Sequence, residues 1–270
     1  VGNNIVGGLE IFNPERDGEL DATGLGGNRQ QETSGATLFA IPHFGVSKVL
    51  SDRVTVGLSF TANGGMNTRF NNNIFNSALQ PAIGVTSTFS PTGTPSGFAG
   101  QLEGLVGTVP GLKLKDINAA LAEFDQESSA KPDATLGVNL AQAILAPTIA
   151  YEVVDGHTVG VSALLAYQQF RAHGLGLFKG LSSDGDHVTD QGNDHAFGAG
   201  VRVGWTSRLT DSLTIGGQYS SKIYMDKLDD YAGLFANEGE FDIPAQYGVG
   251  IAWQPSDRTT LALDVQRILY

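Results

Sequence analysis

Asp52-Arg53-Val54-Thr55-Val56-Gly57 is the first of four copies of a pattern that decides how this chain folds. In each copy an Asp in a tight polar turn precedes residues that are alternately apolar and either small or polar. The later copies span residues 155–160, 211–216 and 257–262. Because each turn is only a few residues long, it joins two antiparallel strands into a hairpin. The pattern therefore predicts a chain built from long β-hairpins.

The segments between these predicted hairpins are long, polar and rich in glycine. Short turns at one end of a sheet and long loops at the other are typical of outer-membrane β-barrels. The layout thus predicts a channel or transporter before any single side chain is considered.

The composition of the 270-residue chain excludes several classes of function. Charged residues make up 16% of the chain and the net charge is −12. A nucleic-acid interface needs clustered Lys and Arg, so no nucleic-acid partner is expected. The chain has no Cys, which excludes disulfides, thiolate metal sites and Cys nucleophiles. Its longest apolar stretch, residues 136–151, is too short for a membrane-spanning helix.

Apolar alternation and turn residues predict nine strands. They cover residues 4–12, 37–50, 54–70, 136–153, 158–172, 196–209, 213–225, 245–253 and 259–270. Many approach or exceed the roughly 9–11 residues that a tilted strand needs to cross a bilayer. Strands of soluble proteins typically have about 5–6 residues.

The alternation gives the predicted strands one apolar and one polar face. The apolar set is Val56, Leu58, Phe60 and Ala62, then Ile215, Tyr219, Ile223 and Met225, then Leu261, Leu263, Val265 and Leu269. In a soluble β-sandwich such a face forms the core, whereas in a membrane barrel it meets lipid and the polar face lines the lumen. Alternation fits both folds. Strand length and loop asymmetry favour the all-β, antiparallel transmembrane β-barrel.

The longest connection, residues 71–135, is too long for an ordinary loop and is expected to have structure of its own. Its second half has helical periodicity, with Leu102, Leu105 and Val106 on one short helix and Phe124 on another. In an extracellular loop these side chains would pack on the barrel mouth and capture substrate, or pack only on one another. Residues 1–270 are interpreted as one partial barrel domain with 71–135 as a loop insertion.

Polar residues on the predicted lumen side are candidate ligand contacts. Arg202 and Lys222, with Asp264 and Gln266, could tune the pore electrostatics, hold a plug or touch a ligand. The acidic, His-containing loop 183–195 lacks the full calcium-loop spacing. A bound cation there is the less favoured alternative, so neither a metal nor a cofactor is expected. No series of nucleophile, base and orienting residue is recognisable, and no catalytic residue is assigned.

The stretch Asn63-Gly64-Gly65-Met66-Asn67-Thr68-Arg69-Phe70 places two adjacent glycines in an otherwise regular strand. Paired glycines lower the cost of a bulge or bend and leave the wall without side chains. The pair indicates either a functional opening or an ordinary bulge near the barrel rim.

At these residues the chain resembles the FadL family of outer-membrane transporters. The run Ile41-Pro42-His43-Phe44-Gly45, the turn 51–53 and residues 63–68 resemble the second and third strands of that family. Residues 221–225, 229–236 and 241–245 are similar to a stretch that is distinctive in it, and residues 264–268 fit the strand that follows.

The resemblance implies a monomeric 14-stranded barrel in the outer membrane, plugged by an N-terminal hatch and carrying long-chain fatty acids or aromatic hydrocarbons. The third strand of the family is kinked, which opens a lateral gap for apolar substrates. By this resemblance Gly64 and Gly65, with Asn63, Met66 and Phe70, lie near such a gap. Arg171 is the one residue of its region that could meet a fatty carboxylate.

The chain lacks the hatch and the later strands of the family, so it is expected to be an internal fragment with about nine of 14 strands. The favoured function is passive uptake of hydrophobic small molecules, by a monomer surrounded by outer-membrane lipid and lipopolysaccharide. Substrate would be captured at extracellular loops and released sideways at the third strand. The alternatives are an outer-membrane esterase with a Ser/His pair near the rim, and a soluble adhesin-like binding protein.

Overall fold

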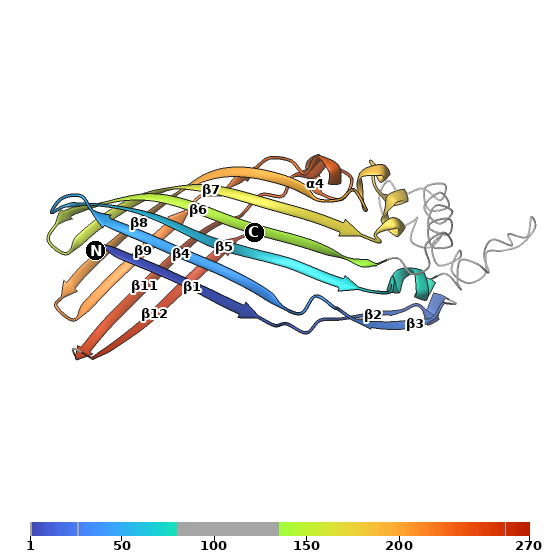
Figure 1. The fold of residues 1–270 in the computed structure, drawn as a ribbon, viewed down its shortest axis with the longest axis horizontal. Coiled ribbons are helices and arrows are strands. Elements are labelled where there is room, and N and C mark those ends of the chain that lie inside the picture. The colour runs from blue at the N-terminus through green and yellow to red at the C-terminus, as the bar shows by residue number, and fades with distance from the viewer. Residues whose placement is uncertain (1, 26, 80–134, 257) are drawn as a thin grey trace, which may run out of the picture.

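The computed structural model describes residues 2–25, 27–79, 135–256 and 258–270. Over these ranges the chain is almost entirely antiparallel β-sheet. Figure 1 shows that the long strands run side by side and curl into a half-barrel. The predicted fold class is thus confirmed. The predicted helices carrying Leu102, Leu105, Val106 and Phe124 lie outside the described residues.

The main sheet contains ten strands in the described part of the chain, and its neighbours follow the order β1-β4-β5-β6-β7-β8-β9-β11-β12, with β10 paired to β8. A separate hairpin pairs β2 with β3. The strands are β1 (Asn4–Phe12), β2 (Asp17–Asp21), β3 (Arg29–Thr33), β4 (Phe39–Val49), β5 (Val54–Phe70), β6 (Leu136–Val154), β7 (His157–His173), β8 (Asp194–Thr210), β9 (Leu213–Ser220), β10 (Tyr224–Met225), β11 (Ala245–Ser256) and β12 (Thr259–Leu269).

Helices are short and lie in the connections. Residues 74–79 are helical, and α4 spans Ala236–Gly239. The 3₁₀ helices are Thr23–Leu25, Gly176–Leu181, Gly185–His187 and Asp229–Tyr231. Of the helices in the described ranges, none is long and apolar enough to cross a membrane.

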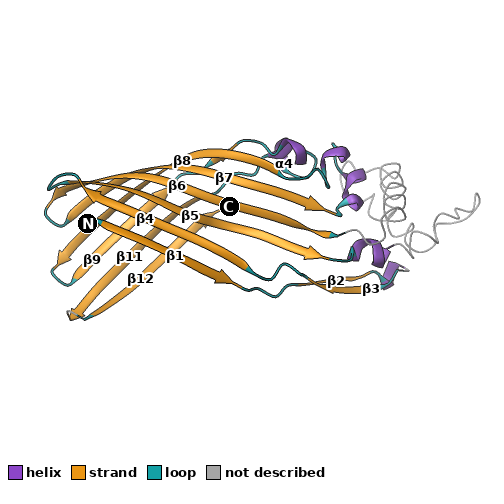
Figure 2. Cartoon of the chain, viewed as in Figure 1, coloured by secondary structure: helices purple, strands orange, loops and turns teal. Residues whose placement is uncertain are grey.

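All the short turns lie at one end of the sheet, as Figure 2 shows, and the long connections lie at the other. The β6–β7 turn consists of Asp155 and Gly156, and Gly156 has φ +80, a backbone conformation that favours glycine. The β8–β9 turn consists of Asp211 and Ser212. The repeated Asp turns therefore make the hairpins that the sequence predicts.

The two faces of the sheet have the predicted composition. Register places Val56, Ile149, Val161 and Val203 in one row across four strands, because paired residues share a face. This outer face is apolar and open, with Val161 51% exposed. Leu164, on the opposite, concave face, is 1% exposed. Register also places Leu58, Ile215, Leu261 and Leu263 on the outer face.

The predicted strand 213–225 is wrong in its last residues. β9 ends at Ser220, and the chain turns inward before β10 pairs with β8. Ile223 was expected on the outer face but is 2% exposed inside the half-barrel, where its backbone pairs with that of Ile243. Met225 also packs against the interior. Burial of Ile223 among interior side chains favours this turn over a continued strand.

The hairpin β2–β3 was not predicted. Its residues include Asp17, Glu19, Arg29 and Glu32, which carry charge rather than the β-branched and aromatic side chains typical of strands. Gly18 lies against Phe70 and Ile74, so the hairpin packs on the end of β5.

Candidate functional site

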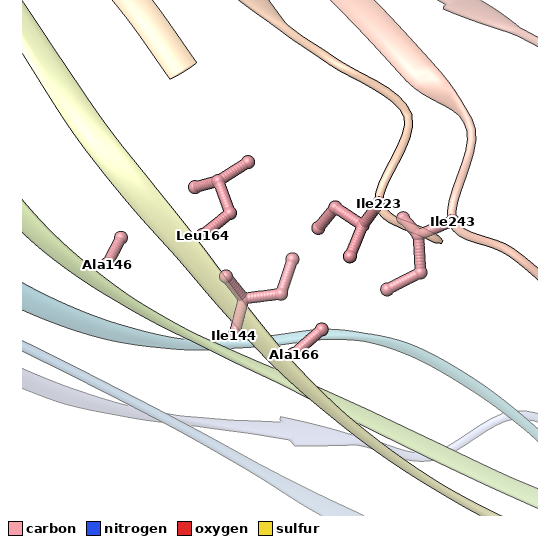
Figure 3. Close-up of a cluster of buried hydrophobic side chains, with 6 residues drawn as sticks. All are labelled: Ile144, Ala146, Leu164, Ala166, Ile223 and Ile243. Carbon is pink, nitrogen blue, oxygen red and sulfur yellow. The ribbon is translucent and has the colours of Figure 1, made fainter. Parts of the chain in front are cut away.

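The concave face is apolar in the half nearest the long connections. Ile144 and Ala146 of β6 and Leu164 and Ala166 of β7 form one buried cluster with Ile223 and Ile243. Figure 3 shows the last two, from the connection between β9 and β11, facing the strand residues. The 221–244 connection therefore folds into the half-barrel and covers its inner wall.

An aromatic cluster lies further toward the long connections. Phe170 of β7 meets Tyr231 and Phe235 edge-on, with ring centroids 4.9 and 4.8 Å away, and Phe235 lies 5.0 Å from Phe241. The Tyr231 hydroxyl donates to the carbonyl of Gly192 (2.7 Å) and accepts from the N–H of Ala172 (3.1 Å). Tyr231 is fully buried, so it fixes the 221–244 connection over the mouth of the half-barrel.

The concave face becomes polar toward the short turns. Thr148 and Ser162 share a hydrogen bond of 2.8 Å between their hydroxyl oxygens, and Arg202 donates from Nε to Ser220 Oγ at 2.8 Å. Thr148, Ser162 and Arg202 border a trough of about 790 Å³. Among its other lining residues are Thr158, Thr206, Thr214, Gln218, Asp264 and Gln266.

β5 has a bulge at the glycine pair. Its register against β6 shifts by one residue between Ala62 and Gly64, so Asn63 is the inserted residue. An insertion reverses the alternation of faces beyond it. Met66 and Phe70 therefore face inward, opposite Leu140 and Leu136. Without the insertion their even numbers would place them on the outer face with Leu58.

The ladder between β4 and β5 ends beside this bulge. The two strands pair from Val49↔Thr55 to His43↔Thr61. Beyond this point β5 continues to Phe70 with β6 as its partner, and β4 continues to Phe39 with β1 as its partner. β4 and β5 thus part at the level of the glycine pair.

Hydrogen bonds close the far side of this opening. Arg16 donates from Nη1 to the carbonyl of Asn67, and the N–H of Gly35 donates to the carbonyl of Arg69 at 2.8 Å. The opening therefore extends along β5 over residues 62–66, and we call it the β4–β5 window. Met66 lies in it and is 48% exposed.

A row of three side-chain amides leads from the bulge to the inner wall. Asn63 Nδ2 donates to Gln142 Oε1 at 3.1 Å, and Gln142 Nε2 donates to Gln168 Oε1 at 2.6 Å. Gln168 is fully buried on β7 between Ala166 and Phe170. Its Nε2 has no hydrogen-bond partner in the described structure.

The structure brings together some of the residues predicted for the site. Asn63, Gly64, Gly65 and Met66 line the β4–β5 window, and Phe70 packs with Ile74 and Leu136 beyond it. Leu102, Leu105, Val106 and Phe124 lie outside the described residues.

The three predicted cations are dispersed. Arg202 belongs to the polar trough. Lys222 Nζ forms ion pairs with Asp242 (2.6 Å) and Glu240 (3.3 Å), and the hydrogen bond to Asp242 is the main cause of its raised pKa. Arg171 pairs with Asn139 on the face opposite Phe170, so it does not share the inner wall.

Gln142, Gln168, Tyr231 and Phe235 were not predicted as site residues. The two glutamines interrupt otherwise apolar inward positions of β6 and β7, and that interruption was a usable signal. Nothing in the sequence alone indicated that the 221–244 connection would bring Tyr231 and Phe235 inside.

Histidines of the candidate cation loop and of a candidate Ser/His pair form hydrogen bonds with neighbouring side chains. His187 Nδ1 lies 2.8 Å from Asp184 Oδ2, and this hydrogen bond raises the pKa of His187. No group of three or more potential metal ligands occurs in the described ranges. Ser207 Oγ lies 2.8 Å from His157 Nδ1 near the short turns, and Ser207 is 7% exposed.

Solved structures share this fold, whereas no protein-family model and no curated protein matches the chain. The P. putida toluene transporter TodX is 16% identical with a TM-score of 0.58, over 98% of this chain and 61% of that one. The Ralstonia pickettii toluene transporter TbuX is 17% identical with a TM-score of 0.53, over 99% and 62%. A Pseudomonas aeruginosa FadL homologue is 14% identical with a TM-score of 0.50, over 97% and 59%.

These comparisons establish the fold. The chain spans about three fifths of the length of each of the three transporters.

Proposed function

We propose that this chain forms the greater part of a FadL-type barrel that carries hydrophobic small molecules passively across the outer membrane. The shared fold supports this, since the similar structures are toluene transporters and a FadL homologue. The sheet supports it too, because β1 and β12 are open edges in the described part, and a spanning sheet needs closed edges.

The outer face supports a membrane location. Tyr151, Trp205 and Trp253 lie outward near the short turns, and Tyr167, Phe197 and Tyr247 lie outward toward the long connections. Along β8, Phe197 and Trp205 are separated by roughly 26 Å at about 3.3 Å per residue, which at a strand tilt of about 35–45° is roughly 20 Å across the membrane. Transmembrane barrels have an apolar band about 25 Å tall between two aromatic girdles. This outer face matches that arrangement, and lipid is its proposed neighbour.

The observation that carries the transport route is the change in the inner wall beside the β4–β5 window. The apolar cluster ends at Ala146 and Leu164, and the next inward positions are Thr148 and Ser162. The window begins beyond Thr61, which pairs with Ile144 of the same cluster. An apolar molecule that moves along the inner wall from the long connections would therefore reach the window, beside residues 140–143 of β6, before it reaches the trough, which begins at Thr148.

Leaving sideways is energetically better for such a molecule than entering the trough. Transfer of apolar surface from water to an apolar environment is favourable by about 0.8 kcal/mol per CH₂. The window leads toward the proposed lipid-facing side, whereas the trough presents hydroxyls, amides and the charged groups of Arg202 and Asp264 among glycines, alanines and larger apolar residues. We therefore place the exit at the β4–β5 window, with no covalent chemistry and no energy coupling.

A reversible block of the window tests this route. These 270 residues have no Cys, so Met66→Cys introduces the one thiol of this part of the protein, at the inner edge of the window. A bulky methanethiosulfonate label on this thiol in the whole protein should reduce toluene uptake by cells several-fold, and a reductant should restore it. Val161→Cys is the control, because its thiol is equally open on the outer face of the fully paired strand β7. Uptake that the Met66→Cys label leaves unchanged would refute the lateral route.

A further inference from the structure

Gln168 is a buried amide at the inner wall with one unused hydrogen-bonding group. Its Oε1 accepts from Gln142, and Gln142 in turn accepts from Asn63. When amide side chains are bonded in a row, with each Nδ2 or Nε2 donating to the next oxygen, the first keeps an unused oxygen and the last keeps an unused N–H donor. At Asn63 the free end is exposed, and at Gln168 it is a buried Nε2 without a partner in the described structure.

The environment of Gln168 makes this free donor costly. The residues two positions before and after it on the inner face, Ala166 and Phe170, belong to the two buried apolar clusters. A buried donor without an acceptor destabilises the folded protein, whereas an apolar side chain of similar size would not. The donor is therefore best explained by an acceptor that arrives with a ligand.

Met225 gives a ligand a way to reach this donor. Its side chain packs against both clusters that flank Gln168, so it lies over the boundary between them. A methionine side chain is unbranched and repacks readily around a bound molecule. Aromatic rings of Phe170 and Tyr231 border the same region and suit a planar or extended apolar ligand.

No free cation accompanies the donor on the described inner wall. Lys222 is paired with Asp242, and Arg202 is bonded to Ser220 within the polar trough. Arg171 lies on the opposite face of β7, although its buried Nε also has no hydrogen-bond partner in the described structure. A carboxylate buried beside Gln168 would thus lack the opposite charge that it needs.

We propose that Gln168 makes the inner wall selective for neutral hydrophobic molecules that carry one hydrogen-bond acceptor, such as ketones, esters or ethers. This deepens the proposed transport function and rests on it. Gln168 Nε2 donates to the ligand oxygen while Phe170 and the neighbouring apolar residues enclose the hydrocarbon part.

Matched ligands of one skeleton test the selectivity. Binding of ethylbenzene, acetophenone and benzoate to the detergent-solubilised whole protein is measured by calorimetry, for the wild type, Gln168→Leu and Gln168→Met. The wild type should bind acetophenone tightest and benzoate at least tenfold more weakly. Both variants should lose about tenfold in acetophenone affinity, the effect of about one hydrogen bond, and keep or improve ethylbenzene affinity.

Gln169→Leu is the control, because Gln169 is the next residue of β7 and lies on the opposite, outer face of the strand. It should change neither affinity. Equal losses for ethylbenzene and acetophenone in the Gln168 variants, or tighter binding of benzoate, would overturn the proposed selectivity. Ethylbenzene binding by the wild type would then still support the transport function. Failure of the wild type to bind any of the three would instead count against that function.

Discussion

Asn63 shows how a single inserted residue changes which side chains of a strand face inward and which face outward. Without the bulge, Met66 and Phe70 would continue the outward row of Leu58 and Phe60. The inserted residue turns both side chains inward, and Phe70 becomes 9% exposed against Ile74 and Leu136. The glycine pair predicted a bulge, because glycines tolerate it. The sequence could not show which residue is inserted, and therefore which side chains change face, since that depends on pairing with β6.

Gly65 is required by a close approach of two backbones. A Cβ at this position would lie 2.8 Å from the carbonyl oxygen of Leu140 on β6. Gly65→Ala should therefore strain the β5–β6 ladder and cost about 1–3 kcal/mol in the free energy of unfolding. Chemical unfolding of the refolded protein in lipid vesicles measures this cost.

Gly7→Ala is the matched control for Gly65→Ala. Gly7 also lies in a strand, and a Cβ there would meet nothing within 4 Å. Its substitution should change stability by less than about 0.5 kcal/mol. Equal costs for the two variants would contradict the close approach. A valine at Gly65 would strain the ladder as well as fill the window, so the labelled Met66→Cys variant is the cleaner test of the exit route.

At the scale of elements, the strands were predictable because their patterns are local. β1 and β5 have the predicted bounds, residues 4–12 and 54–70. The end of β9 was not predictable, because Ile223 and Met225 continue its alternation. Only their contacts with residues distant in the sequence show that both side chains lie inside the half-barrel. Lys222 pairs with Asp242 and Ile223 with Ile243, both on the far side of the same connection. An apolar residue facing lipid and one buried in the interior look alike in a sequence.

The 221–244 connection is expected to depend on the Tyr231 hydroxyl. Tyr231→Phe removes the hydrogen bonds to Ala172 and Gly192 and leaves these backbone groups unpaired in an apolar cluster. The variant should lose about 1–3 kcal/mol of stability. Hydrogen exchange should rise selectively in residues 226–241. Tyr247→Phe, on the outer face, should alter neither quantity, and exchange that rises equally in both variants would contradict the anchoring role.

At the scale of the whole molecule, alternation predicted two faces but not which of them meets which solvent. A soluble sandwich and a membrane barrel share the pattern. The curl of the sheet shows which face is concave, because Leu164 and Ile144 face the concave side while Val161 and Leu263 stay open on the convex side. Curl arises from pairing of strands far apart in the sequence, such as β5 with β6 across residues 71–135. Local periodicity does not contain that information.

Leu58 and Ser59 test the lipid-facing assignment at one depth. They are neighbours on β5, and their partners on β6 are Pro147 of the outer row and Ala146 of the inner cluster. If the convex face meets lipid, Leu58→Arg should cost about 2–4 kcal/mol of stability, the range for a cation near the bilayer midplane. Ser59→Arg should cost much less, because its side chain can reach the polar trough. Unfolding in lipid vesicles can be followed by fluorescence of the two tryptophans, Trp205 and Trp253. A protein whose convex face met water would reverse the order, since Leu58→Arg would then be nearly neutral while Ser59→Arg would place a charge toward the interior.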